Sequence, residues 1–156
     1  MFKMITALVA LSMASQGLAN PFECPRGLKP VRPAMVEAKV DDDKRAGQTR
    51  RFYKTQGETV FGMRVFALEY LRVVNYMDDG SKGFTEFNYL SQVDGDLDDV
   101  IAKVEGTGAK CSPVEDTSLT NACMTNDGRM ISVYPALNAE LPDSRGIVIH
   151  CAISDE

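Results

Sequence analysis

Apolar and β-branched residues alternate with polar ones over three stretches in the middle of the chain. The stretches read TRRFYKTQ from Thr49, ETVFGMRVFALEYLRVVNY from Glu58, and FTEFNYLSQVD from Phe84. The short segments GE and MDDGSKG lie between them, and both are rich in turn-forming residues. This pattern is typical of antiparallel strands joined by hairpins.

The segment 59–76 does not follow one period throughout. Its charges at Arg64, Glu69 and Arg72 do not keep to one side of a strand, and they do not define one face of a helix either. The high content of Val, Phe and Tyr favours a strand over a helix. In a strand, Gly62 would mark a bulge or a close approach of another backbone.

The stretch VDGDLDDVIAKVE, residues 93–105, has the period of a helix. Its apolar residues are spaced at i, i+3, i+4 and i+7: Leu97, Val100, Ile101 and Val104. Asp96 stands directly before them as an N-cap, and Gly106 follows as a stop signal. The sequence therefore predicts a helix from Leu97 to Glu105.

The same stretch has nearly the spacing of a calcium-binding loop. The ligand positions 1, 3, 5 and 12 of such a loop would be Asp94, Asp96, Asp98 and Glu105. The sixth position, where the loop needs glycine for its sharp turn, is Asp99. A helix that begins after Asp96 would also separate Asp96 from Glu105 by roughly 13 Å. We therefore predict a capped helix and no metal site.

Two further strands and a final one are expected in the last third of the chain. Asn126, Asp127 and Gly128 form a turn between two short strands, and the range 135–144 is a loop that leads to the last strand. One face of that last strand carries apolar residues: Ile147, Ile149, Cys151 and Ile153. The predicted fold class is α+β, with an antiparallel sheet of five to seven strands and one main helix packed on one face.

The first residues have the pattern of a secretory signal peptide. Lys3 precedes an apolar run, and small residues lead to an expected cleavage site after Ala19. No later segment is long and apolar enough to cross a membrane as a helix. We therefore divide the chain into a signal peptide at 1–19, a Pro-rich N-terminal arm at 20–47 and a single α+β domain at 48–156.

The Pro-rich arm is predicted to be extended. Its KPVRP segment has the P-x-x-P form that aromatic grooves bind, and attachment of the arm through Cys24 explains this segment more simply. The charged run Asp41 to Arg45 is predicted to be a solvated turn.

Four cysteines fit an exported protein with two disulfides. Cys111 and Cys123 enclose a short polar stretch, so a local bridge between them is preferred, and Cys24 is left to pair with Cys151. The chain has one His and no C-x-x-C pair, which argues against a zinc site. No cofactor is predicted.

Charge and catalytic motifs exclude several activities. The net charge of −5, without a basic stripe, makes nucleic acid an unfavourable partner. His150 is the only histidine and no G-x-S-x-G turn is present, so a serine hydrolase triad is not predicted. A pair of carboxylates, such as Glu69 with Glu86, could still support hydrolysis.

The segment YMDDGSKG should form a hairpin tip with an aromatic rim. Tyr76, Met77 and Phe84 are the candidate partner-binding residues at this tip. We predict a periplasmic or secreted, disulfide-stabilised domain that binds another protein without being an enzyme, as an inhibitor does. A small carboxylate-dependent hydrolase and a structural protein of the cell envelope are the alternatives, and no motif resembles a particular family.

Overall fold

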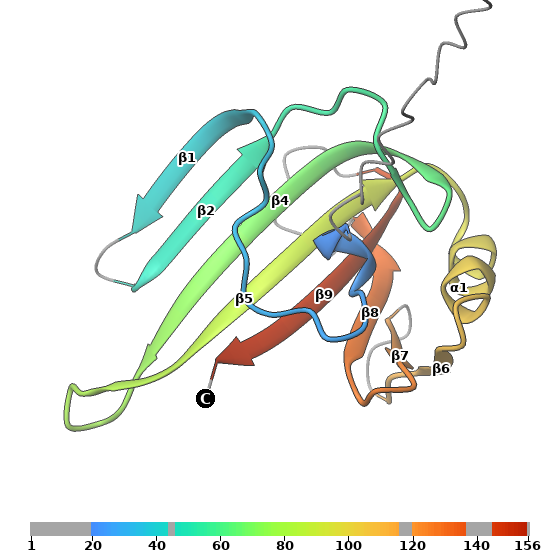
Figure 1. Ribbon diagram of the computed structural model, residues 1–156. Helices are drawn as coiled ribbons and strands as arrows, with labels where there is room; N and C mark the ends of the chain where they lie inside the picture. The colour runs from blue at the N-terminus through green and yellow to red at the C-terminus, as the bar shows by residue number, and fades with distance from the viewer. Residues whose placement is uncertain (1–19, 44–45, 116–119, 137–144, 156) are drawn as a thin grey trace, which may run out of the picture.

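The computed structural model describes residues 20–43, 46–115, 120–136 and 145–155. Within these ranges the chain forms one nine-stranded antiparallel sheet, in the order β1-β2-β4-β5-β9-β8-β7-β6, with β3 paired to β4 (Figure 1). The strands are β1 (Glu37–Asp43), β2 (Gln48–Tyr53), β3 (Thr59–Val60), β4 (Met63–Tyr76), β5 (Lys82–Val93), β6 (Lys110–Pro113), β7 (Asn121–Met124), β8 (Met130–Pro135) and β9 (Ile147–Asp155). A 3-10 helix η1 (Pro21–Glu23) and the α-helix α1 (Leu97–Glu105) complete the fold.

The predicted sheet of five to seven strands with one main helix is wrong. The sheet has nine strands, and three of them, β1, β3 and β6, carry little sequence signal. All residues of β1 after Glu37 are exposed, so no burial pattern marks this edge strand, and β3 is two residues long. The helix has nine residues and contacts β6, β7 and β8 at one end of the sheet, so it does not form a layer.

The ambiguous segment 59–76 is extended, as predicted, and contains β3 and β4. Val60 pairs with Met63, so Phe61 and Gly62 form a two-residue hairpin turn between the strands. Their φ angles of 50° and 74° are those of a type I′ turn, in which both central residues have positive φ. The expected bulge at Gly62 is therefore wrong, because this glycine provides the left-handed conformation of a tight turn.

One face of the sheet carries the main core, and we call it the core face. Its buried side chains include Tyr70 on β4, Tyr89 on β5, and Ile149 and Cys151 on β9. The predicted apolar face of the last strand is confirmed: Ile147, Ile149 and Cys151 are buried, and Ile153 packs against the core. We call the other side, which carries Glu69 of β4, the opposite face.

The helix α1 begins and ends where the sequence predicted. The Asp96 carboxylate accepts a hydrogen bond from Asp99 N at 3.0 Å, so Asp96 is the N-cap. Val100 and Val104 are completely buried, and Gly106 N donates to Ala102 O at the C-terminal end. Leu97 and Ile101 pack against the core from the same side. The capped-helix interpretation of this acidic stretch is confirmed.

Both predicted disulfides are present, Cys24–Cys151 and Cys111–Cys123. The first bridge ties the N-terminal arm to β9 across the core face. The arm runs from η1 over β9, β5 and β4 to the edge of the sheet, as Figure 1 shows. Its last part is the strand β1, so the acidic residues 41–43 lie in a strand and not in the predicted turn.

Some predictions fall outside the described residues. These are the signal peptide at 1–19, the end of the acidic run at 44–45 and most of the predicted loop at 135–144. Among the residues that the structure describes, no helix is long and apolar enough to cross a membrane.

Candidate functional site

The hairpin of β4 and β5 extends past its neighbours in the sheet. The pairing of β2 with β4 ends at Gln48 and Val73, and the pairing of β9 with β5 ends at Asp155 and Thr85. Val74 N still donates a hydrogen bond to Gly47 O at 2.9 Å. Beyond Val74 and Thr85 the two strands bond to each other alone among the described residues, which makes the hairpin project from the sheet (Figure 1). The predicted partner-binding residues lie on this projection.

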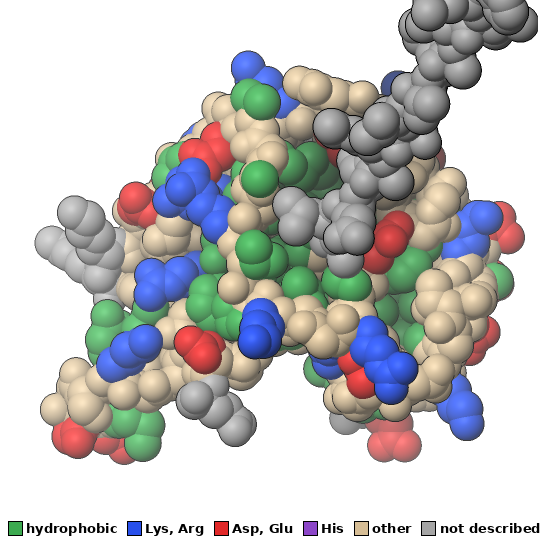
Figure 2. Space-filling view, viewed as in Figure 1, with side chains coloured by type: hydrophobic (Ala, Val, Ile, Leu, Met, Phe, Trp, Pro, Cys, Tyr) green, Lys and Arg blue, Asp and Glu red, His purple; other side chains and the backbone are tan. Residues whose placement is uncertain are grey.

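The hairpin tip, residues 76–84, exposes large apolar side chains. Tyr76 is 58% exposed, Met77 60% and Phe84 44%. Tyr76 and Phe84 are also the only aromatic residues among the exposed large hydrophobic residues of the described chain. In Figure 2, hydrophobic and acidic side chains occur together at this projecting tip. The structure therefore brings the three predicted residues to one exposed end of the molecule.

The turn of the tip is held by its own hydrogen bonds. Met77 N donates to Ser81 O at 2.9 Å, and Gly80 N donates to Met77 O at 2.8 Å. The Asp79 carboxylate accepts from the Ser81 hydroxyl at 2.6 Å and from Ser81 N at 2.9 Å. The bonds from Ser81 lower the pKa of Asp79, so this carboxyl is ionised at neutral pH. A tip with a defined shape loses less entropy when it binds a partner.

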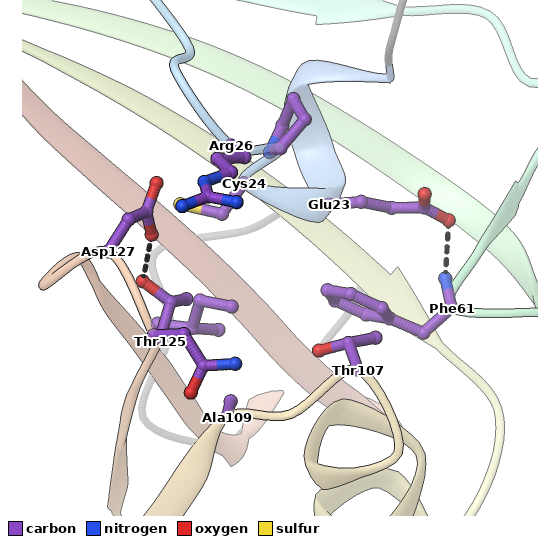
Figure 3. Close-up of a pocket in the computed structure, with 11 residues that line it drawn as sticks. Glu23, Cys24, Arg26, Phe61, Thr107, Ala109, Thr125 and Asp127 are labelled. Atoms are coloured by element: carbon purple, nitrogen blue, oxygen red, sulfur yellow. Dashed lines mark hydrogen bonds between the residues drawn. The ribbon is translucent and has the colours of Figure 1, made fainter.

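A cavity of about 700 Å³ lies at the opposite end of the sheet, and the sequence did not predict it. Four loops that are distant in sequence line it: the arm near Cys24, the turn at Phe61, the segment after α1 and the turn between β7 and β8 (Figure 3). One side is closed by Glu23, whose carboxylate accepts a hydrogen bond from Phe61 N at 2.7 Å. No local sequence pattern could reveal a cavity whose walls come from four separate segments.

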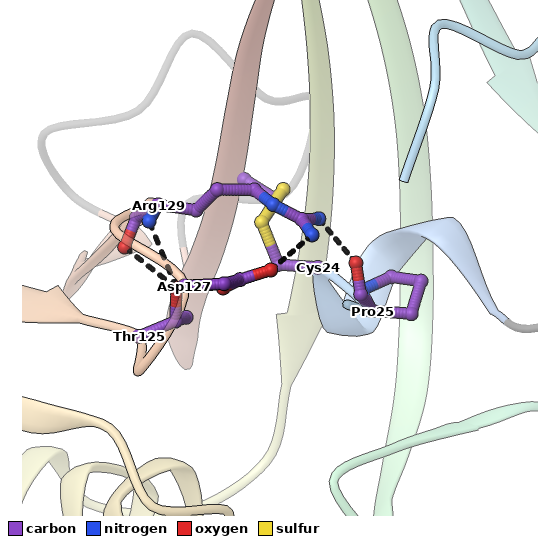
Figure 4. Close-up of polar contacts among 6 residues, drawn as sticks. Cys24, Pro25, Thr125, Asp127 and Arg129 are labelled. Carbon is purple, nitrogen blue, oxygen red and sulfur yellow. Dashed lines mark hydrogen bonds and ion pairs between the residues drawn. A yellow bond between two sulfur atoms is a disulfide. The ribbon is translucent and has the colours of Figure 1, made fainter. Parts of the chain in front are cut away.

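Charged groups beside the cavity serve to attach the arm. Arg129 donates one hydrogen bond to Pro25 O, and its guanidinium lies 2.5 Å from the Asp127 carboxylate (Figure 4). A hydrogen bond from the Thr125 hydroxyl, helped by Arg129, lowers the pKa of Asp127 to about 2. Asp127 thus carries no proton to donate near neutral pH, and the geometry shows a structural contact between the arm and the β7–β8 turn.

His150 lies on the opposite face of the sheet. One ring nitrogen, Nε2, is 2.6 Å from Asn88 Oδ1, and Asn88 donates to the Glu86 carboxylate at 2.8 Å. Burial lowers the pKa of His150, and the nearby Glu86 acts against this decrease. Ser132 is the cross-strand neighbour of His150, but within the described residues no hydroxyl or thiol is hydrogen-bonded to the ring. The described residues around His150 therefore provide no activated nucleophile.

The predicted carboxylate pair is not assembled. Glu69 is opposite Leu90 on β5, and Glu86 is opposite Val73 on β4, so four residues along the strands separate them. This offset is roughly 13 Å, whereas the carboxyls of glycoside hydrolases lie about 5 to 9.5 Å apart. Glu69 lies 3.7 Å from the Arg50 guanidinium and is nearly completely buried. The two carboxyls do not face each other across a substrate site.

The acidic residues of the calcium-like stretch serve the helix and its surroundings. Asp96 caps α1, and the Glu105 carboxylate accepts a hydrogen bond from Cys111 N at 3.2 Å. Among the described residues, no three His, Cys, Asp or Glu side chains are grouped so that they could hold a metal ion.

No protein-family model, no curated protein and no solved structure matches this chain.

Proposed function

We propose that this protein is a non-enzymatic binding domain that works outside the cytoplasm and inserts its β4–β5 hairpin tip into a concave surface of another protein. The projection of this hairpin, with Tyr76, Met77 and Phe84 exposed at its end, is the observation that carries the proposal. Aromatic and methionine side chains are enriched at the centres of protein interfaces.

The chemistry of the tip specifies the kind of partner. Three large apolar side chains need an apolar cleft, and the adjacent carboxylates of Asp78 and Asp79 favour a basic rim around it. The net charge of −5 also favours association with a basic protein. The partner would therefore have an apolar cleft surrounded by Lys or Arg.

The covalent structure supports the proposed compartment. Two disulfides, with no free cysteine among the described residues, fit a small domain that folds in an oxidising environment. Secretion through the predicted signal peptide would bring the chain to such an environment.

Site-specific photocrosslinking in the native host tests the proposal. A photoreactive amino acid at position 77 should give a discrete crosslinked product with one partner protein. Position 124 is the matched control, because Met124 is a methionine of similar exposure, 49%, on a different part of the sheet. The same product should be lost when Tyr76→Ala or Phe84→Ala is added, because removal of an interface anchor costs about 2 kcal/mol or more of binding energy.

The purified partner should then bind the protein in a titration, and Tyr76→Ala should weaken this binding by at least about tenfold. Identical products from positions 77 and 124 would show that the tip has no specific partner. Unchanged affinity in both Tyr76→Ala and Phe84→Ala would also contradict the proposal.

A further inference from the structure

A strained aromatic turn forms one wall of the cavity beside the arm. Phe61 occupies the first central position of the type I′ turn between β3 and β4, with a φ of 50°. Bulky side chains rarely adopt positive φ, and this position before a glycine favours Asn. The Phe61 ring packs against the core and also lines the cavity, into which it points in Figure 3. Backbone strain is thus tolerated where it places an aromatic ring in this wall.

The walls of the cavity are fixed by contacts within the chain. The Glu23 carboxylate accepts a hydrogen bond from Phe61 N at 2.7 Å, which connects the arm to the turn. The disulfide at Cys24 holds the same part of the arm on β9. The Thr107 hydroxyl donates to Val104 O at 2.6 Å and anchors the segment after α1. The cavity volume of about 700 Å³ lies within the range of small-molecule sites, roughly 300 to 1,000 Å³.

The deep part of the cavity is apolar, and its rim is polar. Among the lining residues, Ala109 and Ile131 are buried, whereas Arg26 and Asn126 are exposed. The side chains of Arg26 and Asn126 form no hydrogen bond or ion pair within the described residues. A Cβ atom on Gly108 would lie 2.7 Å from Asn126 Nδ2, so this glycine makes room for the amide. Two polar side chains at the rim are therefore available to a ligand.

The charges around the rim favour a neutral ligand. Arg26 is positive and Glu23 and Asp127 are negative, so the rim has no single sign. Both carboxylates already accept hydrogen bonds, Glu23 from the backbone of the turn. Asp127 accepts from the Thr125 hydroxyl at 2.6 Å and from Arg129. An ionic ligand would find no strong field of opposite charge here, whereas a hydroxyl can still donate to a carboxylate, which accepts several hydrogen bonds.

We propose that this cavity is a binding site for a saccharide. A sugar ring has a face of C–H groups that packs on an aromatic ring, here Phe61, and hydroxyls that both donate and accept hydrogen bonds. Arg26 would donate to sugar oxygens, and the Asn126 amide would donate and accept. The site lies at the end of the sheet away from the hairpin tip, and it goes beyond the proposed function and does not rest on it.

Titration with neutral sugars, followed through the backbone amide signals in NMR spectra, tests the site. The probes are glucose, galactose and N-acetylglucosamine, and the disaccharides cellobiose, lactose and diacetylchitobiose. We expect saturable binding of at least one probe, with shifts at the amides of Phe61, Thr107 and Asn126. The free amino acids lysine and glutamate are the charged comparison ligands, and they should not bind.

Variants of Phe61 separate stacking from packing in the turn. Phe61→Asn creates the pair of residues that type I′ turns prefer, so the β3–β4 hairpin should persist. It should weaken sugar binding by about tenfold or more, because the stacking contact is lost. Phe61→Leu keeps an apolar side chain without a flat ring and should lose as much. Phe61→Tyr keeps the ring and should bind sugar as the native protein does.

A pair of arm variants tests the polar rim. Arg26→Gln should weaken sugar binding by about threefold or more through loss of a charged donor. Lys29→Gln is the matched control, because Lys29 is an exposed cation of the same arm that does not line the cavity, and its binding should be unchanged.

Four results would overturn the saccharide site. The first is the absence of saturation for every sugar up to about 50 mM, a range that covers millimolar dissociation constants. The second is binding of lysine or glutamate in this cavity without binding of any sugar. The others are equal affinities of Phe61→Leu and Phe61→Tyr, which would reduce the ring to a packing role, and equal losses in Arg26→Gln and Lys29→Gln.

Discussion

The Tyr89 hydroxyl donates a hydrogen bond to Val31 O at 2.6 Å and accepts one from Val31 N at 3.0 Å. Tyr89 is completely buried in the middle of the sheet, and Val31 lies in the centre of the KPVRP segment of the arm. The aromatic surface that this P-x-x-P segment contacts is thus part of the same chain. Together with the disulfide at Cys24, this contact holds the arm on the core face.

Tyr89→Phe should lower the unfolding free energy by about 1 to 2 kcal/mol, because it removes both hydrogen bonds to Val31 and keeps the ring contacts with Phe22 and Tyr70. Urea unfolding measures the loss, and hydrogen exchange of the Val31 amide should become faster. Tyr76→Phe, at an exposed position, should change the stability by less than about 0.5 kcal/mol. Slow exchange of the Val31 amide in Tyr89→Phe would contradict this role.

Stability should fall in alkaline solution. Burial raises the pKa of Tyr89 and of Tyr134 to about 12, whereas an unfolded tyrosine ionises near about 10. The unfolded chain therefore loses these protons first, and stability that is complete below about pH 10 decreases as the pH rises towards about 12. Urea unfolding at a series of pH values measures the unfolding free energy, and the combined Tyr89→Phe and Tyr134→Phe variant should lose less of it between about pH 10 and about pH 12. An equal loss in the variant would show that other groups cause the alkaline destabilisation.

The two disulfides should contribute unequally to stability. Cys24–Cys151 closes a loop with a sequence separation of 127, and Cys111–Cys123 one of 12. Loop entropy predicts losses of about 5 and about 3 kcal/mol when each pair is replaced by serine. Denaturant unfolding of the two double variants compares them, and limited proteolysis should cut the arm first in Cys24→Ser/Cys151→Ser. Equal stability of the two variants would contradict the loop-entropy argument.

Asp96→Ala should destabilise the protein by about 1 kcal/mol through loss of the cap of α1, and Asp96→Asn should have a much smaller effect because Asn also caps helices well. Asp94→Ala, at an exposed position before the cap, serves as the control. Thermal unfolding gives the melting temperature of all three variants. Calcium should leave the melting temperature of the native protein unchanged. A micromolar calcium site that is lost in Asp98→Ala would instead show that the stretch is a calcium-binding loop.

Features that depend on neighbouring residues were predictable. The helix α1 was located from its apolar spacing and its Asp96 cap, and the last strand from alternation that leaves Ile149 and Cys151 on one face. The Cys111–Cys123 bridge followed from short spacing, which left one remaining pair. The helix and the local bridge are formed by interactions between residues close in sequence. The last strand pairs with the distant β5, but its alternation of apolar and polar residues is a local pattern that marks the strand before its partner is known.

Features that depend on pairing between distant segments were decided by the tertiary structure. The strand β1 forms because β2 provides hydrogen bonds to an exposed and acidic segment, so its own side chains do not mark it as a strand. Strand register separated Glu69 from Glu86, and the same register placed Arg51 beside Tyr70. By itself, the amino-acid sequence determined the capped helix, the hairpins and the disulfide pairs. The path of the arm was decided by contacts between distant residues, the Tyr89–Val31 hydrogen bonds and the Cys24–Cys151 disulfide. The number of strands and their register were decided only by long-range backbone pairing, because a shift of one residue in register would turn every side chain to the other face.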